Sequence, residues 1–165
     1  MLKRQEGSPE ITIPRITNKV RFAGIVKGIN TSEKRGTVKE PVETAELIEA
    51  YGIAGDAHAG DWHRQISLLG IESTYKMKSN GISDIGPGSF AENITTEGIT
   101  LYTLPVGTLL KIGDAELKIT QIGKECHKDC DIKRLTGDCV MPREGVFAAV
   151  VRGGTIRLGD SIEIV

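Results

Sequence analysis

The chain has 165 residues, 39% hydrophobic and 26% charged, a balance typical of one globular domain. Its formal net charge of -1 shows no basic excess of the kind typical of nucleic-acid binding, so no nucleic-acid partner is expected. No apolar run is long enough to cross a bilayer and the N-terminus has no apolar signal core, so we expect a cytoplasmic protein without a membrane partner.

The first half of the chain predicts short strands, loops and one helix. Residues 1–17 form a polar arm that we expect to be flexible. Residues 19–29 alternate at period two, which predicts a strand with one face formed by Val20, Phe22, Gly24 and Val26.

The segment from residue 42 to residue 51 is compatible with either a strand or a helix. The glycines of 52–60 predict a loop, and residues 64–69 predict another strand. Residues 69–81 favour a helix, with Glu72 and Lys76 paired at i,i+4 spacing and a stop at Gly81.

A near-repeat dominates the second half. Residues 107–120 and residues 154–165 each carry an alternating segment, a Gly-Asp pair and a second alternating segment. Glycine at the first turn position is typical of a two-residue hairpin, so both copies predict a β-hairpin. The expected fold class is therefore mainly β, a closed barrel or sandwich with a few short helices.

Three cysteines, Cys126, Cys130 and Cys139, pose the main chemical question. An odd number argues against a fully paired disulfide framework. Together with His127 they provide the four ligands of a structural zinc site on paper. Cys126 and His127 are adjacent, however, and neighbours in a strand point to opposite faces.

Cys126 is also a candidate for a single working thiol. Lys124, His127 and Lys128 would favour its thiolate, while Glu125 and Asp129 would oppose it. The spacing alone leaves four roles open, namely nucleophile, persulfide carrier, ligand of a soft metal, or surface cysteine without a role.

Two loops carry further polar residues. Residues 52–65 include two Asp-x-His pairs, which suit either metal ligation or simple turns; the residues are Asp56, His58, Asp61 and His63. Residues 86–93 expose backbone N–H groups that can receive an anion. Further donors to such an anion are Ser89, Asn93, Arg64 and Arg143.

An ordered set of stretches ties these features together: "GIAGDAHAG", "RQISLL", "GSFAENITTEGI", "LPVGTLLKIGDAELKITQIGKEC" and "REGVFAAVVRGGTIRLGDSIEI". This set resembles the MOSC family, the domain found at the C-terminus of molybdenum cofactor sulfurases and in small stand-alone bacterial proteins. The resemblance implies a single MOSC domain over residues 18–165 and a closed barrel like that of a pyruvate kinase domain.

The resemblance also implies a molybdenum (or tungsten) cofactor, the pterin-based molybdopterin, as ligand. Its key cysteine falls on Cys126, which would carry sulfur or ligate molybdenum. Asn93 matches a position that contacts the cofactor in related domains. The remaining cofactor-binding candidates are Ser89, Arg64, Asp56, His58, Lys124 and Arg143. The family's common glycine before Glu-Asn is Ala91 here, which is expected to shift the loop.

The chain is too short to hold a pyridoxal-phosphate desulfurase domain as well, so no pyridoxal phosphate is expected. A sulfur-carrier role would therefore need a cysteine desulfurase as donor and a molybdoenzyme as acceptor. The sequence does not decide whether the protein is an enzyme. The alternatives are a non-catalytic zinc protein and a cofactor-dependent reductase of N-oxygenated compounds that needs an external electron donor.

Overall fold

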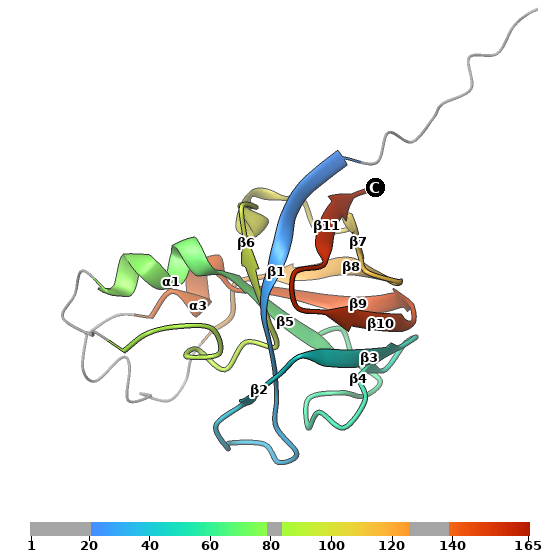
Figure 1. Ribbon diagram of the computed structural model, residues 1–165, viewed down its shortest axis with the longest axis horizontal. Coiled ribbons are helices and arrows are strands. Elements are labelled where there is room, and N and C mark those ends of the chain that lie inside the picture. Colours follow the sequence, from blue (N-terminus) through green and yellow to red (C-terminus); the bar gives the residue numbers. More distant parts are fainter. Residues whose placement is uncertain (1–20, 79–83, 126–138) are drawn as a thin grey trace, which may run out of the picture.

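The computed structural model describes residues 21–78, 84–125 and 139–165 (Figure 1). The predicted arm, residues 1–17, lies outside the described residues. The same is true of Gly81, Cys126, His127 and Cys130.

Seven strands of the described chain form a closed barrel. In order around the barrel they are β1 (Arg21–Thr31), β11 (Ser161–Ile164), β7 (Leu109–Ile112), β8 (Ala115–Ile122), β9 (Val146–Arg152), β5 (Ile66–Gly70) and β6 (Ile94–Glu97). Neighbouring strands are antiparallel except β5 and β6. Because β1 pairs with β6 on one side and β11 on the other, the sheet closes on itself, which confirms the predicted mainly β barrel.

A smaller sheet flanks the barrel, in the order β10 (Gly154–Arg157), β3 (Thr44–Ile48) and β4 (Gly52–Ile53). The short strand β2 (Glu40–Val42) pairs with the end of β1. Residues 42–51, which were compatible with a strand or a helix, therefore contain strand β3. The predicted loop at 52–60 begins with the two-residue strand β4.

One of the two predicted hairpins is confirmed and the other is wrong. Strands β7 and β8 pair around Gly113, whose φ of +53° lies in the left-handed region that favours glycine. In the second copy, however, β10 pairs with β3, while β11 pairs with β7 and β1. The turn between them is tied to the barrel instead, because Gly159 N–H donates to Val26 O and Val26 N–H donates to Asp160 O. A Gly-Asp turn thus joins two paired strands of a hairpin at residues 113–114. At residues 159–160 the same pair of residues joins two strands that belong to different sheets.

Aliphatic side chains fill the barrel, as expected for a chain with 4% aromatic residues. Val26 and Ile29 of β1 are among the fully buried residues. Phe22, predicted to share a face with Val26, is instead 70% exposed. The pairing of β1 with β11 shifts between Phe22 and Gly24, and such an irregularity breaks the period-two alternation.

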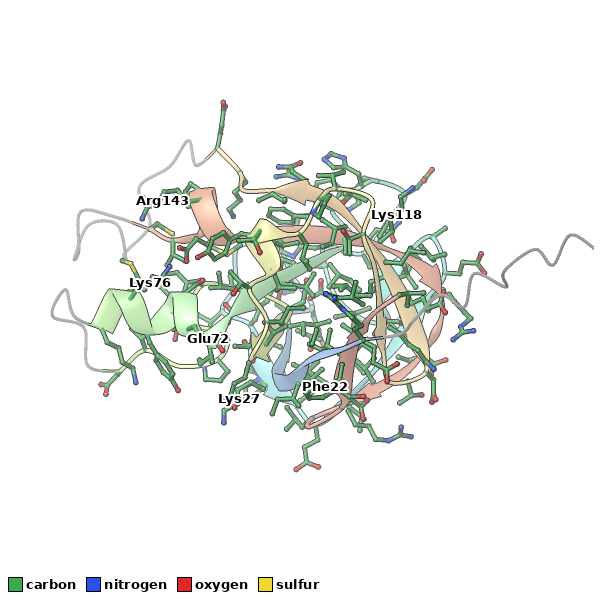
Figure 2. The ribbon with its side chains drawn as sticks, turned by 90° about the horizontal axis from the view of Figure 1, so that it is seen from above. Phe22, Lys27, Glu72, Lys76, Lys118 and Arg143 are labelled. Atoms are coloured by element: carbon green, nitrogen blue, oxygen red, sulfur yellow. The ribbon has the colours of Figure 1, made fainter. Side chains whose placement is uncertain are left out.

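The helices lie together on one side of the barrel (Figure 1). They are α1 (Ile71–Lys78) and the short α3 (Met141–Glu144), with a 3₁₀ turn, η1, at Leu101–Thr103. Helix α1 confirms the predicted helix, but the Glu72–Lys76 ion pair does not form. Glu72 accepts a hydrogen bond from Gly98 N–H, and Lys76 pairs with Glu144 of α3 at 2.5 Å (Figure 2). No helix in the described residues has the length and apolar character that a membrane span requires.

Gly123 follows the last residue of β8 and precedes Lys124. A substitution at Gly123 therefore tests how rigidly the backbone is packed at this end of the strand. Its φ is +72°, and a Cβ at this position would lie 2.2 Å from Pro142 O. We expect Gly123→Ala to lower the free energy of unfolding by about 2–5 kcal/mol, through backbone strain and overlap with α3. Denaturant titration measures this loss.

Gly159→Ala is the matched control, because its φ is +82° and no atom lies within 4 Å of the added Cβ. We expect only the strain of about 1–2 kcal/mol there. Equal losses for the two variants would show that the contact with α3 is not rigid.

Candidate functional site

A cavity of about 330 Å³ opens where β5, β6 and β8 meet their loops. Arg64 precedes β5, Asn93 precedes β6, and Lys124 follows β8. The described residues that line the cavity are Arg35, His58, Trp62, Arg64, Ser67, Phe90, Ala91, Asn93, Lys124, Met141 and Phe147. The lining combines positive charge with aromatic surface.

Four of the residues predicted from the sequence come together at this cavity, namely Arg64, His58, Asn93 and Lys124. Asp56, Ser89 and Arg143 are not among the described lining residues. Arg143 lies on α3 (Figure 2), where its charge helps to lower the pKa of Glu144, behind the larger effect of Lys76. The predicted thiol, Cys126, lies outside the described residues, so its position relative to the cavity stays a prediction.

The other lining residues were not predicted from the sequence. Arg35 lies in a charged stretch of ordinary surface composition, and Trp62 was not among the predicted site residues. Met141 and Phe147 come from α3 and β9, and their apolar character predicts burial rather than a ligand site. Only the fold brings these residues beside Arg64.

A buried ion pair supports one wall of the cavity. Lys39 Nζ lies 2.9 Å from Asp56 Oδ1, and each residue is only 5% exposed. Asp56 also accepts hydrogen bonds from the backbone N–H groups of Ser32 and His58, at 3.0 and 3.1 Å. Burial alone would raise the pKa of Asp56, but the Lys39 hydrogen bond and these N–H donors together lower it. Asp56 is therefore ionised and occupied in holding the loop.

This arrangement leaves no support for metal ligation by the 52–65 loop. His63 contacts Gln121 at 2.7 Å and Asp56 contacts Lys39, so the two Asp-x-His pairs do not converge. Within 21–78, 84–125 and 139–165, no three His, Cys, Asp or Glu side chains gather as a metal site. The turn interpretation of this loop is the one that agrees with the structure.

Trp62 connects the ion pair to the arginines. Its Nε1–H donates to His58 O at 2.8 Å, which fixes the indole beside the cavity. The guanidinium carbon of Arg64 lies 4.8 Å from the Trp62 ring centroid and 5.5 Å from that of Phe147. Arg35 also contacts Trp62, at 5.6 Å. Stacking on aromatic rings holds an arginine in place while leaving its N–H groups available for a ligand.

Arg64 carries an unsatisfied donor. Its Nε is buried and has no hydrogen-bond partner among the described residues. A buried donor left without an acceptor costs about 1–3 kcal/mol, so such a group calls for an explanation. Because Nε is itself enclosed, a ligand in the cavity meets the rest of the Arg64 side chain and reaches Nε only when that side chain turns.

Asn93 is 1% exposed and its amide groups are used by the fold. Its Oδ1 accepts from Ser67 N–H and Ser67 Oγ–H, at 3.0 and 3.1 Å. Its Nδ2 donates to Asn30 O at 3.1 Å. Asn93 thus joins β1, β5 and β6 at the base of the cavity, where it also forms part of the wall.

The 86–93 loop does surround an anion, but the anion is the protein's own Glu92. This fully buried carboxylate accepts from Gly88 N–H at 2.7 Å, Phe90 N–H at 3.1 Å and Thr95 Oγ1–H at 2.7 Å. Gly86 N–H donates to Ser89 Oγ, so Ser89 is used within the loop. The N–H groups of Gly86, Gly88 and Phe90 are therefore used within the loop, which agrees with a plain turn rather than with an external anion. Burial raises the pKa of Glu92, and the hydrogen bonds only partly offset it.

Ala91 has a φ of +60°, a conformation that glycine adopts far more easily. The residue next to Glu92 therefore keeps a backbone typical of glycine despite its methyl group. Ala91 lines the cavity, so this backbone conformation shapes the site directly.

Residues 54–163 match the MOSC domain. The chain belongs to the MOSC family. That family is associated with the molybdenum cofactor, which gives the cavity a class of ligand to be tested against its residues. A search among curated proteins gave no match.

Solved structures agree with this assignment at the level of the fold. The YuaD protein of Bacillus subtilis is 19% identical, with a TM-score of 0.73 over 86% of this chain and 94% of that chain. YiiM of Escherichia coli is 18% identical, with a TM-score of 0.61 over 88% of this chain and 69% of that chain. YiiM of Geobacillus stearothermophilus is 18% identical, with a TM-score of 0.60 over 88% and 75%.

Glu92 offers a test of the loop beside the cavity. In Glu92→Gln the amide nitrogen cannot accept the hydrogen bond that one carboxylate oxygen now accepts. We expect the free energy of unfolding to fall by about 1–3 kcal/mol, because a backbone N–H is left buried without a partner. Denaturant titration at neutral pH measures this loss.

Glu97→Gln, at the far end of the strand β6 that follows Glu92, is the control, since Glu97 is 43% exposed and pairs with Lys27 only at 3.5 Å. Its removal is expected to cost at most about 1 kcal/mol. A loss for Glu92→Gln no larger than that of Glu97→Gln would mean that Glu92 does not hold the loop.

Proposed function

We propose that this MOSC domain binds a molybdenum or tungsten pterin cofactor and takes part in its sulfuration, delivery or use, with Cys126 as the working thiol. The observation that supports this best is the charge of the cavity. Arg35, Arg64 and Lys124 line it, and no Asp or Glu is among its described lining residues. Uncompensated cations around an aromatic-walled cavity suit an anionic, planar ligand.

The described residues fit the molybdopterin group. Arg64 would hold its phosphate through the guanidinium group, and Arg35 and Lys124 would add further positive charge. The rings of Trp62, Phe90 and Phe147 provide apolar surface for the flat pterin. When bound, the cofactor supplies a redox-active metal and its sulfur ligands.

Each lining group has a distinct task in this proposal. Arg64, held between Trp62 and Phe147, orients the anionic end of the ligand through directed N–H groups. Lys124 adds a point charge at the end of β8. Asn93, just before β6, ties β5 to β1 at the cavity, because its amide bonds both Ser67 and Asn30.

Cys126 follows Lys124 by two positions in the sequence, and we propose that its thiol acts at the same cavity. As a soft thiolate it would either carry a persulfide sulfur or ligate the metal. The sulfur-carrier role would need a cysteine desulfurase as donor and a molybdoenzyme as acceptor. Use of the cofactor in place, for instance to reduce N-oxygenated compounds, would need an external electron donor.

Cofactor binding by Arg64→Gln tests the proposal. Loss of a charge-assisted hydrogen bond of about 1.5–3 kcal/mol is expected to weaken binding roughly 10- to 100-fold. Purified protein is incubated with molybdenum cofactor, and bound molybdenum and pterin are measured after gel filtration. Arg157→Gln, at an exposed position on β10 away from the cavity lining, is expected to bind like the wild type.

Cys126→Ser in the same assay separates the roles of the thiol. We expect a folded protein that retains the pterin contacts but loses bound molybdenum or transferable sulfur. Equal cofactor binding by wild type and Arg64→Gln would contradict the cavity as the site. Stoichiometric zinc that is lost when Cys130 and Cys139 are replaced would instead establish the structural-zinc alternative.

A further inference from the structure

His58 contacts a buried lysine. Lys39 Nζ lies 3.2 Å from His58 Nδ1 and 2.9 Å from Asp56 Oδ1. A lysine ammonium has only protons to donate, whereas a neutral imidazole has one donor and one acceptor nitrogen. Because Lys39 donates, Nδ1 must be the acceptor and the ring proton must lie on Nε2.

The neighbouring backbone fixes the position of this ring. His58 N–H donates to Asp56 Oδ2 at 3.1 Å, and His58 O accepts from Trp62 Nε1–H at 2.8 Å. Both backbone groups of His58 are therefore held while its side chain, 37% exposed, lines the cavity. The ring nitrogen opposite Lys39 is the one left to meet a ligand.

We propose that Lys39 is a positioning residue that fixes His58 as a neutral imidazole protonated on Nε2, so that His58 offers the cavity ligand an uncharged hydrogen-bond donor.

The charges around His58 support the neutral form. Burial is the largest cause that lowers its pKa, followed by the charge of Lys39, and Arg35 and Lys124 act in the same direction. Asp56, 3.8 Å from Nδ1, is the carboxylate that raises it, and it is already paired with Lys39. With a pKa below the usual 6.5, His58 stays neutral at pH 7. The protonated form of His58 becomes the major form only when the pH falls below this lowered pKa.

A neutral donor has a specific use among three cations. A protonated His58 would add like-charge repulsion against Arg35, Arg64 and Lys124, whereas a neutral Nε2–H adds direction without charge. A ligand group facing His58 must therefore present an acceptor, such as a carbonyl, ring nitrogen or phosphate oxygen. This consequence rests on the proposed function, but the tautomer itself does not.

The test is a long-range ¹⁵N–¹H correlation spectrum of the imidazole groups in the cofactor-free full chain, recorded from pH 5.5 to 8. The chain has three histidines, and His58→Gln assigns the signal of His58. We expect the neutral pattern with the proton on Nε2 at pH 7. A proton on Nδ1, or an imidazolium at pH 7, would overturn the proposal. His63, whose partner is Gln121, is the internal control.

Two variants test whether Lys39 is the cause. Lys39→Met is expected to raise the pKa of His58, because the charge of Lys39 is removed and Asp56 then acts without it. Should this variant fail to fold, Lys39→Met/Asp56→Asn removes both charges and is expected to give a mixture of tautomers. An unchanged His58 signal in either folded variant would overturn the proposal.

Adding molybdenum cofactor to the wild type separates this inference from the proposed function. We expect the Nε2–H signal of His58 to shift on binding and that of His63 to stay. Bound cofactor without a shift at His58 would overturn the donor role. The Nε2–H tautomer with no cofactor bound would contradict the proposed function and leave the tautomer assignment in place.

Discussion

The buried ion pair between Lys39 and Asp56 is the interaction on which the cavity depends. Asp56 fixes the backbone of Ser32 and His58, His58 O holds Trp62, and Trp62 stacks against Arg64. Removing one partner of such a pair leaves a buried charge and typically costs about 3–5 kcal/mol. Neither Lys39 nor Asp56 is among the described residues that line the cavity. The pair therefore orders the lining residues without neutralising their positive charges.

Acidic and basic side chains near the cavity differ in whether the protein itself supplies their partners. The acidic groups near the site are already satisfied, Asp56 by Lys39 and Glu92 by the N–H groups of its own loop. The cations are not, since Arg35, Arg64 and Lys124 meet no carboxylate among the described lining residues. Internal anions thus build the scaffold, and positive charge remains for a ligand. That balance supports the proposal that the cavity takes an anionic pterin.

The fold was predictable where local chemistry decides structure, and less so where pairing is long-range. Alternation and the Gly113 turn predicted the β7–β8 hairpin, but an equivalent pattern at 154–165 divides between two sheets because barrel closure ties Gly159 to Val26. Arg64, His58, Asn93 and Lys124 were predicted from motifs and meet at the cavity. Arg35 and Phe147 were not, since neither carries a local signal. The sequence of the 86–93 loop allowed either a plain turn or an anion site, and it did not indicate that the carboxylate of Glu92 occupies the N–H groups.

The most direct test of this account is the side-chain Nε–H resonance of Arg64 in ¹⁵N-labelled protein, recorded with and without molybdenum cofactor and assigned with Arg64→Gln. Arg64 lines the cavity and its Nε lacks a partner among the described residues, so the account predicts that the Nε–H resonance shifts when a ligand oxygen binds the guanidinium group. An Arg64 signal that stays unchanged while the cofactor binds elsewhere on the protein would contradict the assignment of this cavity as the cofactor site.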